Sequence, residues 1–377
     1  MKKNMIRLAL ALALLTTAVG ATRLMAYGEA GPLRLAQYGY FMVNTEITPE
    51  NTVTEQMFVE FMIPEQRRYE YPVVLVHGGG GQGTDWMSTV DGRDGWVNYF
   101  VNAGFAVYWV DRPGSARSSS NTTYGRGMLA GPRAANGAIG NITSKNWPGA
   151  PMLYKADGTP DLETWRTKNV SNPMVAAWSA TSPTTPFASN EISVAAQAAL
   201  LEKIGPAVVF THSAGGTTAL GSSLRAAANG KLIGLLAFES GGANPYGNVM
   251  LEGASWTNGA PAEAARADRQ IATGTCSLQS AQQKSRNMTL ANARVAYLYS
   301  NRIQDQNVVN TVTCLAEQSR EAGVNTIGVY MPDHAGGEGT GHFVMSETVN
   351  GEVAKNIVIP TLAWLQGGEL PRGFKTH

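Results

Sequence analysis

The stretch that most constrains the fold is residues 207–220, which read AVVFTHSAGGTTAL. An apolar run ends at the turn Thr-His-Ser-Ala-Gly, and small residues compatible with a helix follow it. A strand that enters a helix through so tight a bend almost touches that helix, so the residues beside the serine must be small. The same pentapeptide could instead be an ordinary helix with a serine N-cap. The choice between chemistry and packing therefore depends on the rest of the chain.

Strands and helices alternate around this bend. The predicted strands are 37–47, 54–64, 71–76, 105–114, 206–213, 232–240, 293–301 and 325–333, and the predicted helices are 94–104, 191–205, 214–228, 308–322 and 353–365. An antiparallel start followed by repeated strand–helix units predicts an α/β fold with a mostly parallel central sheet and helices on both faces. Periodicity fades between residues 115 and 190, and so long a loop indicates a cap or lid insertion.

The N-terminus is typical of an export signal. A basic start, MKKNMIR, precedes an apolar run at 8–19 that is shorter than the roughly 20 residues a membrane-spanning helix needs. We therefore expect residues 1–26 to be a cleaved signal peptide and 27–377 to be a mature periplasmic or secreted domain. The formal net charge of +1 gives no reason to expect nucleic acid or an anionic membrane as a partner.

The chain has two cysteines, Cys276 and Cys314. In an oxidising compartment two cysteines most simply form one disulfide, which here would close a long loop. Two unpaired buried thiols are the alternative.

A nucleophilic serine needs N–H donors for the oxyanion that forms when it attacks a carbonyl. The segment VLVHGGGGQGTDW places a glycine run directly after an early strand, where backbone N–H groups can converge on the bend. The predicted donors are the N–H groups of Gly79 and Ala214. A phosphate-binding loop is the alternative, but the segment has neither a Lys-Ser/Thr ending nor a GxGxxG pattern.

The general base of such a site is a histidine. The chain has five, which are His77, His212, His334, His342 and His377. The first belongs to the glycine turn, the second adjoins the serine, and the last is the final residue. Of the other two, His334 directly follows a strand, whereas His342 lies in a loop, GEGTGHFVM, that can return over the sheet. We prefer His342.

The segment DHAGGEGTGH could also be interpreted as a metal site, with Asp333, His334, Glu338 and His342 as ligands. The spacing fits no compact ligand pattern, so no metal is predicted.

The third member is a carboxylate that orients the imidazole. Glu239 ends the strand after the bend, and Asp305 lies just past the next strand. A glutamate in an apolar strand end is costly to bury without a partner. Asp305 lies among polar residues and needs no partner. We prefer Glu239, and Asp305 is the alternative.

Residues 77–119, HGGGGQGTDWMSTVDGRDGWVNYFVNAGFAVYWVDRPGSARSS, resemble the esterase 713 group of secreted bacterial carboxylesterases. This resemblance implies an α/β-hydrolase fold and an ester hydrolase whose acid follows the strand after the serine. That acid maps onto Glu239, with Ser213 and His342. One departure is that Gly79 and Gly80 stand where the type member of the group has adjacent, disulfide-linked cysteines. Substrate preference is therefore not carried across.

These observations predict a secreted serine carboxylesterase that cleaves a small-molecule ester through an acyl-enzyme, with no metal or organic cofactor. A lactonase, an amidase or a polymer-cleaving hydrolase on the same fold is the alternative, and a non-catalytic binding protein is a third. The sequence leaves a homodimer open. We expect Trp86 and Trp96 to pack the fold. The aromatic residues of the cap could contact substrate or form the cap's own core.

Overall fold

The computed structural model describes residues 29–49, 53–78, 81–118, 190–216, 220–239, 285, 288–300 and 306–377. The predicted signal peptide and nearly all of the predicted cap lie outside these residues, so both stay predictions. Among the described residues, no helix is both long enough and apolar enough to cross a bilayer.

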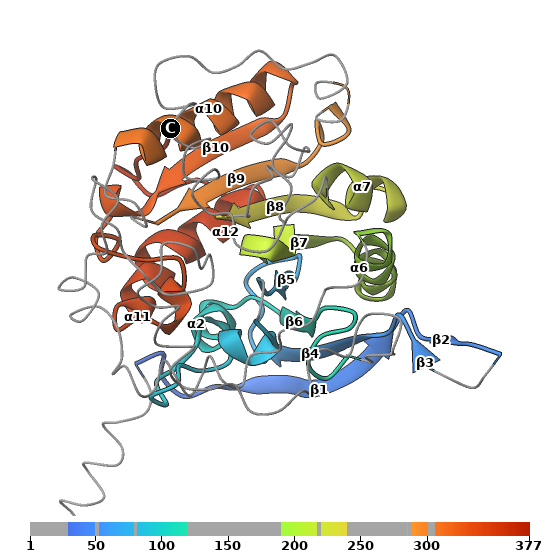
Figure 1. Cartoon of the computed structure of the whole chain (residues 1–377). Coiled ribbons are helices and arrows are strands. Elements are labelled where there is room, and N and C mark those ends of the chain that lie inside the picture. Colours follow the sequence, from blue (N-terminus) through green and yellow to red (C-terminus); the bar gives the residue numbers. More distant parts are fainter. Residues whose placement is uncertain are drawn as a thin grey trace, which may run out of the picture.

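The described strands of the core form a single sheet in the order β1-β4-β6-β5-β7-β8-β9-β10 (Figure 1). Their bounds are β1 Leu35–Val43, β4 Met57–Pro64, β5 Val73–Val76, β6 Val107–Asp111, β7 Ala207–His212, β8 Leu232–Phe238, β9 Arg294–Tyr299 and β10 Asn325–Tyr330. The pairs β1–β4 and β4–β6 are antiparallel, and every pair from β6 to β10 is parallel. The predicted mostly parallel sheet with an antiparallel start is confirmed.

The connection between the first two strands differs from the prediction. The sequence predicts strands at 37–47 and 54–64, whereas the chain adds between β1 and β4 a small hairpin of β2 (Glu46–Ile47) and β3 (Val53–Thr54), which projects beyond the sheet (Figure 1). Asn44 and Glu55 have φ angles of 53° and 60°. Because this left-handed backbone cannot continue a strand, β1 ends before Asn44 and β4 begins after Glu55.

Helices cover both faces of the sheet, as predicted. Their bounds are α2 Trp96–Ala103, α6 Asn190–Ile204, α7 Leu220–Ala227, α10 Gln306–Glu321, α11 Asn350–Val353 and α12 Ile359–Leu365. Side chains alternate along each strand, so Val73 and Leu75 face one core while Val74 and Val76 face the other. The first core lies under α2, α11 and α12 and the second under α6, α7 and α10.

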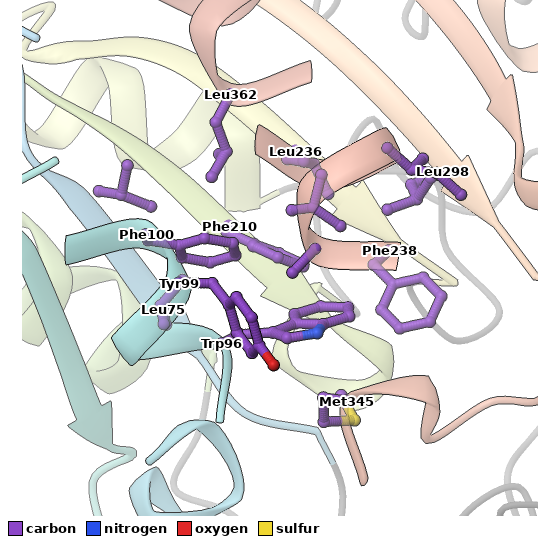
Figure 2. Close-up of a cluster of buried hydrophobic side chains, with 14 of the residues drawn as sticks. Leu75, Trp96, Tyr99, Phe100, Phe210, Leu236, Phe238, Leu298, Met345 and Leu362 are labelled. Atoms are coloured by element: carbon purple, nitrogen blue, oxygen red, sulfur yellow. The ribbon is translucent and has the colours of Figure 1, made fainter. Parts of the chain in front are cut away.

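The first core is the aromatic one (Figure 2). Trp86 and Trp96 are both fully buried there with Phe210, at ring-centroid distances of 5.3 and 5.7 Å from it. The prediction that these two tryptophans pack the fold is confirmed.

The last helix begins earlier than predicted and is irregular. It starts at Asn350 and widens into a π-helical turn, Ala354–Val358, immediately before α12. Pro360 at the start of α12 has no N–H to donate to the preceding turn, which accounts for the widening.

Candidate active site

The tight bend at the end of β7 is present. Ser213 opens a short 3₁₀ helix, η4 (Ser213–Gly216), with a φ of 48°. An N-cap serine has an extended backbone, so this left-handed conformation excludes the ordinary cap considered above. Within the predicted helix 214–228, the structure describes this 3₁₀ turn and α7 (Leu220–Ala227), and residues 217–219 lie outside the described residues.

The positions of Gly215 and Gly78 at the bend leave no room for a side chain. A β-carbon on Gly215 would lie 2.5 Å from the carbonyl oxygen of His77, at the end of β5. A β-carbon on Gly78 would lie 2.8 Å from the β-carbon of Ser213 and 2.9 Å from Nδ1 of His212. Contacts this short are not tolerated, so the bend of β7 and the glycine loop after β5 can touch only because both lack side chains there.

The imidazole of His342 joins the serine to a carboxylate. Its Nε2 lies 2.9 Å from Oγ of Ser213, and its Nδ1 hydrogen-bonds Oε2 of Glu239. The three residues are 1–7% exposed. An ionised carboxylate can only accept, so Nδ1 carries the proton and Nε2 is left as an acceptor for the serine hydroxyl. This is the tautomer that a general base needs.

Glu239 directly follows β8, with a φ of 39°. Its backbone N–H donates to the carbonyl of Leu298 on β9 over 3.0 Å. Its Oε1 accepts hydrogen bonds from the N–H of Ser300, at 2.9 Å, and from the hydroxyl of the same residue. Both carboxylate oxygens therefore have partners, which compensates for burial of the charge. Ser300, for which the sequence predicts no role, directly follows β9, just as Glu239 directly follows the neighbouring β8.

A second histidine supports the first. The Nε2–H of His212 donates to the backbone carbonyl of His342 over 2.9 Å, and the two ring centroids are 4.6 Å apart. Burial and the neighbouring His342 hold the pKa of His212 well below its usual value. His212 is therefore neutral and fixes the backbone of the residue that contacts Ser213.

Two hydrogen bonds tie the glycine loop to the end of β6, one at His77 before the glycine run and one at Gly83 after it. At one end, Nε2 of His77 accepts the N–H of Arg112 at 3.0 Å while its Nδ1–H donates to the carbonyl of Gly78 at 2.9 Å. At the other end, the N–H of Gly83 donates to Oδ1 of Asp111 over 2.5 Å. Burial lowers the pKa of His77 to about 4, so its ring is neutral.

Of the two predicted oxyanion donors, the structure describes the backbone of one. The backbone of Ala214 lies in η4, directly after the serine. Gly79 lies outside the described residues, although both of the loop's anchors are within them. The assignment of these two donors stays a prediction.

The alternative base, His334, lies away from this arrangement. Its ring packs against that of Phe374, with centroids 4.2 Å apart and the planes tilted by 38°. The neighbouring Asp333 binds Lys375 and His377, each over 2.7 Å. Within the described part of the chain, no group of three or more potential ligand residues could hold a metal ion.

Two further predictions concern residues that the structure does not describe. The alternative acid, Asp305, lies outside the described residues. So does Cys276, whereas Cys314 is buried on α10, so the disulfide stays a prediction.

No protein-family model matches the chain. A protein of a fungal species (strain ATCC 74256), described as "Probable secreted lipase phiG", is 30% identical to it over 166 residues. The matched segment covers 43% of this chain and 43% of the fungal protein, so the chain matches less than half the length of this relative.

Among solved structures, the one described as "The Atomic Resolution Structure of a Novel Bacterial Esterase" aligns with a TM-score of 0.61 and 18% sequence identity. The alignment covers 89% of this chain and 98% of that one. At this identity the likeness establishes a shared fold.

Proposed function

We propose that this chain, which has the α/β-hydrolase fold, is a secreted serine hydrolase that cleaves small-molecule carboxylic esters. The observation that carries the proposal is a buried pair of hydrogen bonds, one from Ser213 to Nε2 of His342 and one from Nδ1 of His342 to Glu239. Similarity to a protein described as a secreted lipase supports esters as the substrate class.

The proposed reaction follows from the atoms in contact. Oγ of Ser213 attacks the ester carbonyl while Nε2 of His342 takes its proton, and Glu239 stabilises the imidazolium that forms. His342 then returns the proton to the departing alcohol as the ester C–O bond breaks, which leaves an acyl-serine. Water attacks this acyl group and gives a proton to the same nitrogen. His342 then passes this proton to Oγ of Ser213 as the bond between Oγ and the acyl carbon breaks, which releases the acid and restores the serine hydroxyl.

The oxyanion of each tetrahedral intermediate needs fixed donors, and we assign the N–H groups of Ala214 and Gly79 to this role. Ala214 is suited to it because the first N–H groups of a helix have no acceptors within that helix. Support for Gly79 comes from its neighbours, since His77 and Gly83 tie the glycine loop to the end of β6 on both sides.

Intact-mass analysis after treatment with a fluorophosphonate tests the proposal. We expect wild type to gain one adduct and Ser213→Ala to gain none. Glu239→Gln should slow labelling strongly, because a neutral amide cannot stabilise the imidazolium, whereas Asp305→Asn should label like wild type. An adduct in Ser213→Ala contradicts the proposed nucleophile. Loss of labelling in Asp305→Asn alone would move the acid to that residue.

A substrate panel separates the remaining functions. We expect p-nitrophenyl esters to be cleaved faster than lactones or anilides. A preference for lactones or anilides would favour a lactonase or an amidase, and release of monomers from a polyester film would favour a polymer-cleaving hydrolase. A chain that neither labels nor turns over any substrate would be a binding protein.

Export is a separate part of the proposal. We infer that residues 1–26 are removed and that the mature domain is periplasmic or extracellular. N-terminal sequencing of the exported protein, with fractionation of the cells, tests this. Chromatography of the mature protein on a calibrated sizing column would test the predicted option of a homodimer.

A further inference from the structure

A buried carboxylate, that of Glu347, binds the backbone of the loop that carries His342. Glu347 is fully buried, and its Oε1 accepts the backbone N–H of Gly341 over 2.8 Å. Gly341 immediately precedes His342, whose own carbonyl is held by His212 on the other side. The backbone of His342 is thus fixed by one hydrogen bond before it and one at its carbonyl.

Glu347 is itself placed by a turn that Arg93 binds. The short helix η6 (Val344–Ser346) ends there, and the guanidinium of Arg93 meets its carboxyl end. Nη1 donates to the carbonyls of Glu347 and Thr348 at 3.0 and 3.4 Å, and Nη2 donates to the carbonyl of Ser346 at 3.3 Å. A planar cation with several donors suits the outward-pointing carbonyls at the end of a helix.

The turn also contacts Arg93 and the residues just after it through Asn350. Nη1 of Arg93 reaches Oδ1 of Asn350 at 2.8 Å, Nδ2 of Asn350 donates to the carbonyl of Asp94 at 2.8 Å, and the indole N–H of Trp96 donates to the carbonyl of Asn350 at 3.0 Å. Met345 lies in the same buried cluster as Trp96 (Figure 2).

Neighbouring residues orient the side chain and backbone of Arg93 independently of the turn. Its Nε donates to Oδ2 of Asp91 over 2.8 Å, and its backbone N–H donates to Oγ1 of Thr89 over 2.9 Å. The guanidinium is therefore a preorganised donor, and its side chain is 21% exposed. Little rotamer freedom is lost when it binds the turn.

We propose that Arg93 and Glu347 are positioning residues for His342, acting through the 346–350 turn and the N–H of Gly341. The inference rests on the proposed function, because its readout is the acylation of Ser213. It assigns a role to the segment DGRDGW, residues 91–96, which is linked to His342 through the 346–350 turn and supplies no group to the reaction. Arg93 and Glu347 should change the rate of proton transfer without changing how the ester binds.

Steady-state and burst kinetics of the full chain with p-nitrophenyl acetate test this. We expect Arg93→Ala to lower kcat about 10- to 100-fold, because small displacements of a reacting group cost rates of that order. KM should stay within about twofold, since ground-state contacts are unchanged. Glu347→Ala should behave in the same way. Glu347→Gln should recover most of the activity, because its amide oxygen can still accept the N–H of Gly341.

The matched control is Arg225→Ala. Arg225 also binds backbone carbonyls, those of Gly230 and Leu232, but in a turn at the opposite end of β8 from Glu239. We expect its kcat to equal that of wild type. A kcat of Arg93→Ala within about twofold of wild type, or an equal fall in Arg225→Ala, overturns the proposal.

Failure to fold and failure of the proposed function are separable outcomes. If Arg93→Ala does not fold, Arg93→Lys takes its place, since it keeps the charge but not the planar fork. A folded Arg93→Lys with wild-type kcat overturns the inference. If wild type gains no phosphonate adduct, the proposed function fails instead. If wild type labels and Arg93→Ala labels at the same rate, the positioning role alone is wrong.

Discussion

The rings of His212 and His342 are 4.6 Å apart between centroids, and the Nε2–H of His212 donates to the backbone carbonyl of His342. The residue before the serine thus holds the residue that contacts the serine. Ser213 and His342 are far apart in sequence, and this contact fixes one relative to the other independently of the hydrogen bond between them.

Removing that donor should impair catalysis more than stability. His212→Phe keeps an aromatic ring in the buried site but leaves the carbonyl of His342 without this partner. We expect kcat for an ester to fall about tenfold while KM changes little. His212→Gln retains a donor and is the control. Equal kcat values for the Phe and Gln variants would contradict the role assigned to the N–H.

The two buried neutral histidines predict an acid-sensitive fold. The pKa of His77 falls from 6.5 to about 4, and that of His212 is also depressed. Between these pH values the unfolded chain binds protons that the folded chain does not, so the free energy of unfolding decreases as the pH falls. For His77 alone the full shift corresponds to about 3 kcal/mol.

Urea unfolding at neutral pH and at about pH 5 measures this loss. His77→Gln removes one of the titrations, so its unfolding free energy should depend less steeply on pH than that of wild type. A slope unchanged by this substitution would show that other groups dominate the acid sensitivity.

Ser300 should matter through Glu239. Ser300→Ala removes the hydroxyl that donates to Oε1 and leaves only the backbone N–H. Because hydrogen bonds to charged groups contribute about 1.5–3 kcal/mol, we expect kcat to fall about 10-fold or more. Ser319→Ala is the control, since that buried hydroxyl on α10 bonds the carbonyl of Leu315 and the hydroxyl of Tyr297 rather than the carboxylate of Glu239. A similar loss of kcat in both variants would point to general destabilisation.

Gly215→Ala should disturb the bend directly. The added methyl would lie 2.5 Å from the carbonyl oxygen of His77, so β5 and η4 must separate. Overpacking of this kind costs about 1–3 kcal/mol, and we expect a lower Tm together with slow phosphonate labelling. At Gly39, on β1, an added methyl meets only the end of the Phe61 ring at 3.2 Å, so Gly39→Ala should change neither property much. Wild-type labelling by Gly215→Ala would contradict the spatial argument.

Much of the sheet could be predicted because its strands are short apolar runs bounded by glycine and polar residues. The order of the strand and helix elements and the parallel pairing follow from the repeated units. The hairpin β2–β3 could not, since it depends on left-handed backbone at Asn44 and Glu55, and no glycine marks either position. The widened turn before Pro360 was not predicted either, because a proline at this position can also simply begin a new helix.

At the candidate site, the sequence indicated Ser213, Glu239 and His342, but not the residues that hydrogen-bond them and hold them in place. Ser213, Glu239 and His342 each follow a strand or lie in a loop beyond one, and polar groups at strand ends stand out against apolar runs. Ser300 and Glu347 look like ordinary polar residues in sequence, because the contact that gives each its role joins segments distant in the chain. In the sequence, Arg93 stood out only as one residue of the segment 77–119 that resembles the esterase 713 group.

The left-handed backbone of Ser213 has a consequence for engineering. A side chain at that φ is strained, and glycine is not, so Ser213→Gly should unfold at a higher temperature than wild type by calorimetry. A directed-evolution screen that rewards heat resistance alone would therefore tend to select a chain that has lost its nucleophile. Selection for durability in this fold has to be coupled to turnover.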